Sequence, residues 1–337
     1  MAGLVVSRPW GRLATALAVL AAATAVTACG GSDDAAAPAA RTATATAPHT
    51  TAAAGTGAQA ITVAGERTVD DRLREFTLRT PALDQPTHVR VLLPAGYARD
   101  PSRRYPVLYL LHGANSDYRS WTAFGAAEKL TARYPLIVVM PDGGSQGWYT
   151  DWYRGDATVP PRWETYHVNE LVPWVDTRFR TLADRRDRAV AGLSMGGYGA
   201  LEYAARHPDV YAAVASFSGA LEIGSEEALG TRSAEPARWR AHRPVSLADR
   251  LRSLALVEIR TGNGKPGPLD PRDTPADCPA CSLERFLHPS NVRMHERLRA
   301  LGIRHVWDDY GPGTHAWPYW RRDLRETLPD LMRALPS

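Results

Sequence analysis

The stretch AVAGLSMGGYG, residues 189–199, contains Gly192-Leu193-Ser194-Met195-Gly196, which has the pattern G-x-S-x-G. An apolar run precedes this pentapeptide and a helical pattern follows it, so Ser194 stands where a strand turns abruptly into a helix. Glycine is needed on both sides of the serine, because side chains there would crowd the backbone. The pattern predicts a nucleophile elbow, in which Ser194 exposes its Oγ beside the N–H groups that begin a helix.

Apolar runs bounded by turn residues recur on both sides of this elbow. They predict buried strands at residues 107–111, 136–140, 189–192, 213–217, 256–260 and 304–310. Helical stretches alternate with these strands, at residues 121–133, 163–179, 197–206 and 291–301. Such alternation indicates a mainly parallel sheet with helices on both faces. Residues 72–79 and 87–93 alternate polar and apolar side chains and predict an antiparallel hairpin at the sheet edge.

Loops at the carboxyl ends of parallel strands are where functional groups gather in such a sheet. Ser194 follows one predicted strand, and His315 follows the last one in a Gly-rich loop. A serine hydroxyl is a weak nucleophile until a base takes its proton, and a neutral imidazole does this well near neutral pH. We therefore predict that His315 is the base, since it comes after the serine in the order nucleophile, acid, histidine.

The acid that orients the imidazole should come from the loop after the strand at 256–260. Its carboxylates are Asp270, Asp273, Asp277 and Glu284, and the residues alone slightly favour Asp270 because it lies near the strand. An oxyanion hole needs two backbone N–H groups. We expect these from Met195, which follows the nucleophile, and from Ala114, in the loop after the first core strand.

Several longer motifs occur in a fixed order from about Glu66 to the C-terminus: YLLHGANSDYRSW, VMPDGGSQGWYTDWY, GLSMGGYGAL, TGNGKPGPLD and GTHAWPYWRRDL. In these motifs the chain resembles the esterase D superfamily of α/β-hydrolases, and especially the antigen 85 mycolyltransferases. The resemblance implies the α/β-hydrolase fold, with Ser194 as nucleophile and His315 as base. The run SLERFLHPSNVRMHERL matches the segment that bears a catalytic glutamate in that group. The resemblance thus places the acid on Glu284, with Asp270 as the alternative.

Substrate contacts follow from the same resemblance. Trp317 matches a tryptophan that shapes the acyl and sugar site. The antigen 85 enzymes carry an aspartate and an arginine that contact trehalose in the first loop, whereas His112 and Asn115 stand at those positions here. Replacing a carboxylate by an imidazole removes a strong acceptor for sugar hydroxyls, so we do not expect trehalose specificity.

The N-terminus has the layout of an export signal. Arg8 and Arg12 precede the apolar residues 13–26, which are too few to span a bilayer, and Val-Thr-Ala-Cys then ends at Cys29. This resembles a bacterial lipobox, so residues 1–29 are predicted to be a lipoprotein-type signal peptide with a lipidated Cys29. A plain signal peptide and a secreted protein are the alternative. Residues 30–65 are rich in Ala, Thr and Gly and predict a disordered tether, and residues 66–337 form the catalytic domain.

The two other cysteines form the motif Cys278-Pro279-Ala280-Cys281. In an exported protein this spacing favours a local disulfide. A zinc site would need two more ligands, and no second Cys-x-x-Cys occurs. A thioredoxin-like redox role is not expected, because the pair is placed in a Pro- and Asp-rich loop and not at the start of a helix.

These patterns predict an exported serine esterase that acts on acyl esters through an acyl-Ser194 intermediate. Neither a metal nor an organic cofactor is expected. The first alternative is an acyltransferase that passes the acyl group to a sugar or lipid alcohol. A non-catalytic surface binding protein is the second, and the presence of a serine, a histidine and an acid argues against it. The net charge is +4 and only Lys129 and Lys265 of the 40 basic residues are lysines, with no basic run, so no nucleic-acid partner is expected.

Overall fold

The computed structural model describes residues 60–153 and 160–335. The predicted signal peptide with Cys29, and the predicted tether up to residue 59, lie outside these residues. Residues 62–65 were also assigned to the disordered tether, and this is wrong, because they belong to the first strand of the sheet. Within them, one sheet contains nine strands in the order β1-β2-β3-β5-β4-β6-β7-β8-β9. The strands are β1 (Thr62–Thr68), β2 (Leu73–Arg79), β3 (Thr87–Leu92), β4 (Val107–Leu111), β5 (Ile137–Pro141), β6 (Arg188–Leu193), β7 (Ala213–Phe217), β8 (Leu256–Thr261) and β9 (Val306–Asp309).

Strand direction divides this sheet into two parts. β1, β2 and β3 pair antiparallel with one another, and β3 pairs antiparallel with β5. From β5 to β9 every neighbouring pair is parallel. The prediction of a mainly parallel sheet with an antiparallel hairpin beside it is therefore confirmed. The hairpin does not form the edge of the sheet, however, because β1 pairs with β2 on its outer side. The strand β1 was not predicted from the sequence.

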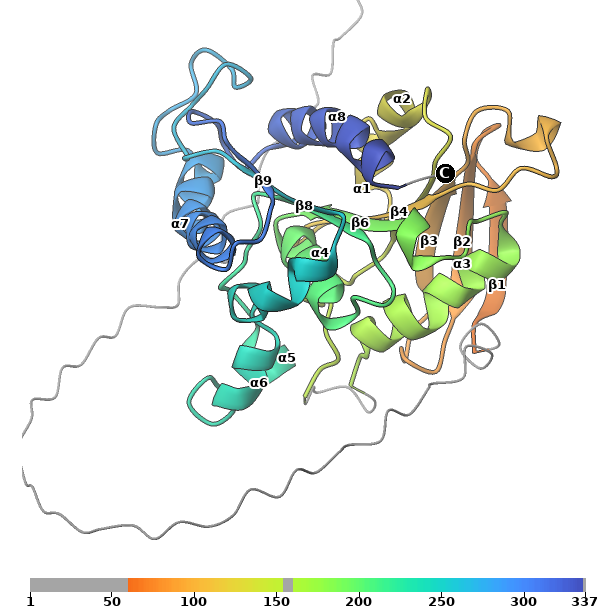
Figure 1. The fold of residues 1–337 in the computed structure, drawn as a ribbon, viewed down its shortest axis with the longest axis horizontal. Helices are drawn as coiled ribbons and strands as arrows, with labels where there is room; N and C mark the ends of the chain where they lie inside the picture. The colour runs from red at the N-terminus through yellow and green to blue at the C-terminus, as the bar shows by residue number, and fades with distance from the viewer. Residues whose placement is uncertain (1–59, 154–159, 336–337) are drawn as a thin grey trace, which may run out of the picture. The chain divides into compact units, whose positions relative to one another are not determined.

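Helices cover both faces of the parallel part (Figure 1). On one face lie α1 (Ser120–Ala123), α2 (Ala127–Thr131) and α8 (Trp317–Ala334). The other face carries the π-helical segment η2 (Thr165–Leu171), α3 (Val172–Arg178), α4 (Met195–Arg206), the 3-10 segment η4 (Pro244–Ser253) and α7 (Pro279–Ala300). The remaining short helical elements are η1 (Tyr97–Arg99), η3 (Arg185–Asp187), α5 (Glu226–Leu229) and α6 (Pro236–Ala241).

Two apolar cores lie on the two faces of the sheet, and β4 contributes to both. Val107, Tyr109 and Leu111 pack into the core that includes α4, and Leu108 and Leu110 pack into the core that includes α8. A strand whose two faces are both covered must be apolar at every position. This explains why β4 and β7 have the bounds predicted from their apolar runs.

The helices differ more from the prediction, and local backbone constraints explain the differences. The helix expected at 121–133 is two short helices, because Ala126 between them adopts a left-handed backbone (φ 54°). The helix expected at 163–179 changes from π to α geometry at Val172, next to Pro173, which has no N–H to donate. The helix expected at 291–301 begins twelve residues earlier, at Pro279, and continues through Pro289.

The early start of α7 corrects the placement of the two cysteines. Cys278 is the N-cap residue of α7 and Cys281 lies in its first turn, so the pair stands at the start of a helix and not in a loop. Pro279 occupies the first helical position, where the missing N–H costs nothing. A disulfide joins Cys278 and Cys281. The geometric argument against a redox role is therefore wrong.

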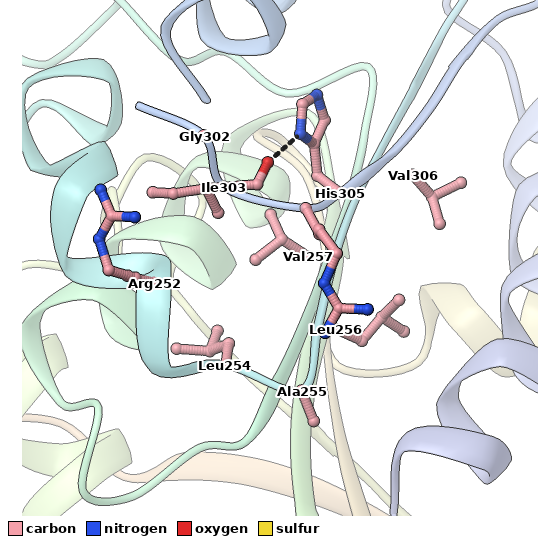
Figure 2. A pocket seen from close by; sticks show the side chains of 10 residues that line it. Arg252, Leu254, Ala255, Leu256, Val257, Gly302, Ile303, His305 and Val306 are labelled. Carbon is pink, nitrogen blue, oxygen red and sulfur yellow. Dashed lines mark hydrogen bonds between the residues drawn. The ribbon is translucent and has the colours of Figure 1, made fainter. Parts of the chain in front are cut away.

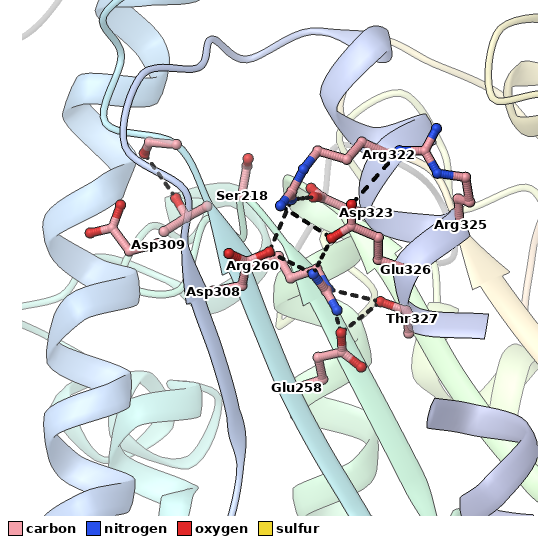
Figure 3. A network of polar contacts seen from close by, with 12 residues as sticks. Ser218, Glu258, Arg260, Asp308, Asp309, Arg322, Asp323, Arg325, Glu326 and Thr327 are labelled. Carbon is pink, nitrogen blue, oxygen red and sulfur yellow. Dashed lines mark hydrogen bonds and ion pairs between the residues drawn. The ribbon is translucent and has the colours of Figure 1, made fainter. Parts of the chain in front are cut away.

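Helix α8 was not predicted, and a buried ion network ties it to the sheet (Figure 3). Arg260 on β8 contacts Glu258 on the same strand, Asp308 on β9 and, at 2.9 Å, the Oε2 atom of Glu326 on α8. The carboxyl group of Asp323 is buried on α8, and burial raises its pKa. Because α8 begins two residues after His315, this network fixes the helix that follows the predicted base.

Candidate active site

The predicted elbow is formed by the end of β6 and the start of α4. Ser194 lies between them with φ 53° and ψ −117°, a conformation that is strained for a residue with a side chain. The surrounding backbone holds it there: the N–H of Ser194 donates to the carbonyl of Phe217 (2.9 Å), and its own carbonyl accepts from Ala220 (3.1 Å). Ser194 is partly exposed, and no hydrogen bond among the described residues occupies its Oγ.

Close packing explains the glycines of the elbow. A Cβ atom on Gly192 would lie 2.4 Å from the carbonyl oxygen of Gly196, and one on Gly196 would lie 2.5 Å from that of His112. Real Cβ contacts are never this short, so larger residues would force strand and helix apart. The G-x-S-x-G pattern thus follows from the geometry that presents the serine.

The loop after β4 approaches Ser194 directly. A Cβ atom on Gly113 would lie 3.3 Å from the Cβ of Ser194. The next residue, Ala114, and the first residue of α4, Met195, have backbone N–H groups that no acceptor takes among the described residues. An oxyanion hole requires two free backbone N–H groups close to the nucleophile, and these two residues can supply them.

His315 and Glu284 form a buried pair. The Nδ1 atom of His315 lies 2.7 Å from Oε2 of Glu284, and the two side chains are 6% and 0% exposed. The backbone N–H of His315 donates to the carbonyl of Ala280 (3.1 Å), and its ring packs edge-on against Trp320 at 4.9 Å. No contact in the described part of the chain takes Nε2, so this nitrogen is available for proton transfer.

The second oxygen of Glu284 is surrounded by neutral donors. Oε1 accepts from the hydroxyl of Ser218 (2.8 Å), the hydroxyl of Thr261 (2.9 Å) and the backbone N–H of Gly262 (2.9 Å). Ser218 itself has a left-handed backbone (φ 48°). Ser218 and Thr261 were missed by the sequence analysis. Their positions gave a usable signal, because Ser218 follows β7 and Thr261 ends β8 at the edge where functional groups gather.

Asp270, the alternative acid, is bound elsewhere. Its Oδ1 accepts from the Thr314 hydroxyl (2.6 Å), and its Oδ2 accepts from the Tyr319 hydroxyl (2.8 Å) and the backbone N–H of Gly267 (2.8 Å). Burial and the bond to Asp270 raise the pKa of Tyr319 to about 12, so the phenol stays a donor. Asp270 therefore supports the loop that carries His315, while the imidazole itself pairs with Glu284.

His112 and Asn115 differ in their access to a substrate. The His112 side chain is 1% exposed. Its Nε2 accepts from the backbone N–H of Gly143 (2.8 Å), so Nδ1 carries the proton and donates to the carbonyl of Gly113 (2.8 Å). The ring thus fastens two loops together, and this burial corrects the predicted substrate contact. Asn115 is exposed and its Oδ1 accepts from Ser145 (3.1 Å), so it borders the open side of the same loops.

Trp317 belongs to an aromatic group beside His315. Its ring lies 5.3 Å from that of Trp121, 5.1 Å from that of Trp320 and 5.7 Å from that of Phe124. Phe124 is 56% exposed, so this group reaches the surface. An apolar surface next to the base suits the acyl chain of an ester.

A cavity of about 330 Å³ lies at the opposite end of the strands (Figure 2). Leu256 and Val257, which begin β8, line it together with Arg252, Ile303 and His305. Ser194 follows the carboxyl end of β6, which runs in the same direction. The cavity is therefore separate from the candidate site.

A further group of carboxylates and histidine could hold a metal by distance alone. The ligand atoms of Glu164, Glu202 and His242 lie within 4.8 Å of one another, and all three residues are buried. The guanidinium of Arg206 is already there, 2.7 Å from Oε1 of Glu164, and His207 lies 2.6 Å from the same oxygen. The guanidinium of Arg206 already balances carboxylate charge that a metal would neutralise, so the group fits an ion-pair cluster better than a metal site.

None of the helices in the described residues is long and apolar enough to cross a membrane.

Known proteins are similar to this chain in sequence and in fold. The family model named Esterase matches residues 80–331. Esterase Rv1288 of Mycobacterium tuberculosis is 35% identical over 271 residues, which cover 74% of this chain and 56% of that protein. The chain thus spans about half the length of this relative. The diacylglycerol acyltransferase/mycolyltransferase Ag85B of Mycobacterium leprae is 32% identical over 68% of this chain and 76% of its own length.

Solved structures are similar over most of the chain. A ferulic acid esterase has a TM-score of 0.60 at 27% identity and covers 78% of this chain and 98% of its own. An S-formylglutathione hydrolase from Agrobacterium tumefaciens has a TM-score of 0.65 at 18% identity, over 81% of this chain and 99% of its own, which shows the shared fold. The predicted α/β-hydrolase fold and the resemblance to the antigen 85 group are confirmed. By its motifs, its sheet and these similarities, the chain belongs to the Esterase family of α/β-hydrolases.

Proposed function

We propose that this protein is a serine esterase in which Ser194 is the nucleophile, His315 the general base and acid, and Glu284 the residue that orients His315. The observation that carries the proposal is the buried contact of 2.7 Å between His315 Nδ1 and Glu284 Oε2, which leaves Nε2 unpaired. A carboxylate at Nδ1 holds the imidazole in the tautomer that can accept a proton at Nε2. The strained elbow supplies the nucleophile for that base.

The proposed reaction has two halves. His315 Nε2 takes the proton of Ser194 as Oγ attacks the ester carbonyl carbon, and the N–H groups of Met195 and Ala114 stabilise the resulting oxyanion. The C–O bond to the alcohol then breaks, and the imidazolium returns its proton to the leaving alkoxide. In the second half, water attacks the acyl-Ser194, His315 accepts the water proton and passes it to Oγ, and the carboxylic acid leaves. Glu284 stabilises the imidazolium in both halves.

Labelling with a fluorophosphonate probe tests the nucleophile. Wild-type protein should react at Ser194 and Ser194→Ala should not. The alternative of a non-catalytic binding protein predicts no label on wild type. Equal labelling of both proteins would remove Ser194 from its role.

Acyl transfer to an alcohol is the second candidate function, and the 32% identity to Ag85B, which is named an acyltransferase, favours considering it. Both reactions share the acyl-Ser194 and differ in whether water or an alcohol attacks it. The apolar group around Trp317 and Phe124 supports a lipid-like acyl donor. Incubation with p-nitrophenyl butyrate and a sugar or monoacylglycerol, followed by measurement of free butyrate against acylated alcohol, separates the two. Butyrate as the sole product with every acceptor would exclude transfer.

We also propose that the protein is exported and anchored to the membrane by a lipid on Cys29. The support is the order of the N-terminal segments: two arginines, an apolar stretch, Val-Thr-Ala-Cys and an Ala-rich tether. Metabolic labelling with an alkyne fatty acid should tag wild type and not Cys29→Ser. Secretion of an untagged wild-type protein would instead support the plain signal peptide.

A further inference from the structure

The N-terminal part of α7 contacts His315 and carries Glu284. The carbonyl of Ala280 accepts the backbone N–H of His315 (3.1 Å). Glu284 follows on the same helix and holds the His315 ring through its carboxylate. Cys278 and Cys281 stand on either side of Ala280 and are joined by the disulfide. The residue whose carbonyl accepts the N–H of His315 therefore lies inside the loop that the disulfide closes.

The first turn of α7 also packs against the loop after β8, which donates a hydrogen bond to Glu284. Gly264 lies so close to it that an added Cβ would be 2.5 Å from the carbonyl oxygen of Cys281. Gly262, two residues earlier in this loop, donates its N–H to Glu284 Oε1 (2.9 Å). A shift of the first turn of α7 would therefore move the loop after β8, the carboxylate and the imidazole together.

The disulfide contributes mainly to this local geometry. It closes a loop with a sequence separation of only three residues, and so short a loop removes little entropy from the unfolded chain. The first turn of a helix lacks internal hydrogen-bond partners for its N–H groups and is held chiefly by its cap. Here the cap is Cys278, whose Sγ accepts from the N–H of Cys281 at 3.0 Å. A covalent bond between the cap and the first turn prevents that turn from fraying.

We propose that the Cys278–Cys281 disulfide is a positioning element for His315 and Glu284, and that its reduction by a dithiol lowers the rate of the acyl-transfer steps reversibly. The inference rests on the proposed function in its effect on rate, but its effect on the His315–Glu284 contact stands apart from it. The two cysteines stand at the start of a helix of 22 residues.

Exposure indicates how the exchange would proceed. Cys278 is half-buried and Cys281 is buried, so a dithiol thiolate reaches Sγ of Cys278. A new S–S bond forms there and Cys281 leaves as a thiolate, which the N-terminal end of α7 stabilises. The second thiol of the reagent then attacks the mixed disulfide and releases Cys278, so the reagent is oxidised to its cyclic disulfide and the protein gains two thiols. Air or an oxidised dithiol restores the original bond.

The experiment compares oxidised and dithiothreitol-reduced full-length protein after the reductant is removed without oxygen. Thiol titration should find two additional thiols after reduction. With p-nitrophenyl butyrate we expect kcat to fall about tenfold and KM to change less than twofold, because small misplacements of catalytic groups are costly. Circular dichroism and the melting temperature report whether the fold is retained.

The low-field proton resonance of the His315 Nδ1–H group, identified by its loss in His315→Gln, measures the contact with Glu284 without any substrate. It should weaken or move upfield on reduction. Cys278→Ser provides the matched variant, since the serine hydroxyl still caps α7 and only the covalent link is lost. This variant should have the lower kcat of the reduced protein and no response to dithiothreitol, and Cys278→Ala, without a cap, should be slower still.

An unchanged resonance and kcat in a protein shown to be reduced would overturn the inference. So would a Cys278→Ser variant with the resonance and the kcat of the oxidised wild type. If the oxidised protein has no esterase activity but its resonance still responds to reduction, the proposed function fails while the positioning role stands.

Discussion

Two histidines in this molecule pair with a buried glutamate, and the two glutamates differ in their other partners. Glu284 binds His315 at 2.7 Å at the carboxyl ends of the parallel strands, where Ser194 also lies. Glu164 binds His207 at 2.6 Å between η2 and the end of α4. The donors on Glu284 besides His315 are two hydroxyls and one N–H group, all neutral. Glu164 also receives the guanidinium of Arg206, at 2.7 Å.

This difference separates a pair suited to catalysis from one suited to stability. A carboxylate with neutral donors keeps its negative charge for the imidazolium that forms during the reaction. A carboxylate already paired with arginine gains less from a charged histidine. Although burial alone would raise it, the bonds to His207 and Arg206 hold the pKa of Glu164 down to about 2. If the proposed function holds, the same two residue types perform different tasks, and four predictions test this.

The largest expected effect comes from the two histidines. His315→Gln should lower kcat/KM by roughly 10⁴- to 10⁶-fold, because Ser194 loses its base. His207→Gln, the matched change in the other pair, should leave kcat/KM within about threefold of wild type. Steady-state hydrolysis of p-nitrophenyl butyrate measures both. Comparable losses in the two variants would show that the pairs do not differ in function.

Substitution of Glu284 should mainly lower kcat, and substitution of Glu164 should mainly lower the free energy of unfolding. Glu284→Gln should lower kcat by up to about 10⁴-fold, since the imidazole loses the carboxylate that orients it. Glu164→Gln should keep most of the activity and lower the free energy of unfolding by ~1.5–3 kcal/mol, because the buried carboxylate loses its charge-assisted hydrogen bond to Arg206, while Arg206 keeps Glu202 at 3.8 Å. Urea unfolding measures the second effect. An active Glu284→Gln together with an inactive Asp270→Asn would move the acid to Asp270.

A smaller effect is expected from the hydroxyl behind Glu284. Ser218→Ala removes one of the donors to Oε1 and should lower kcat about tenfold, because the carboxylate is held less firmly. Ser216→Ala is the control, since the Ser216 hydroxyl is buried on β7 without a hydrogen-bond partner among the described residues. It should leave kcat near wild type. Equal kcat values for Ser218→Ala and Ser216→Ala would remove the positioning role of Ser218.

The last expected effect is on stability at low pH. The pKa of Glu164 is about 2 in the folded protein and 4.5 ordinarily, so the unfolded state binds the proton first as the pH falls. The stabilisation by this group is complete above about pH 4.5 and is lost between there and about pH 2, and amounts to ~3 kcal/mol. The difference in unfolding free energy between wild type and Glu164→Gln should shrink over this range. A constant difference would mean that Glu164 is not the group that titrates.

Predictions from the sequence were most accurate for strands that are buried on both faces. The apolar runs of β4 and β7 end where their burial ends, so their bounds can be read from the residues. Helix bounds were less predictable, because Pro279 and Pro318 suggest breaks but occupy the first turns of α7 and α8, where proline is tolerated. β1 was missed because its residues are mostly exposed and carry no apolar pattern.

One part of the candidate site could be predicted from the sequence and another part could not. The elbow around Ser194 could be predicted, since its glycines and its serine are neighbours in the sequence and their spacing reflects a local backbone constraint. The partner of His315 could not be derived from local pattern, because Asp270 and Glu284 are both acids downstream of the same strand. Only the resemblance pointed to Glu284, and only the packing of α7 against the β8 and β9 loops brings it to the imidazole.

The sequence by itself determined the elements: an elbow with its serine, apolar strands long enough for a doubly covered sheet, and a histidine after the last strand. Periodicity and steric limits act over a few residues, so these features are encoded locally. The tertiary structure decided which groups meet: Ser218 and Thr261 at Glu284, His112 inside the loops, and the disulfide beside the carbonyl that holds His315. Such contacts join segments that are far apart in the sequence. Their energies depend on how deeply the groups are buried and on which charges surround them, and both are set by the packing of several segments.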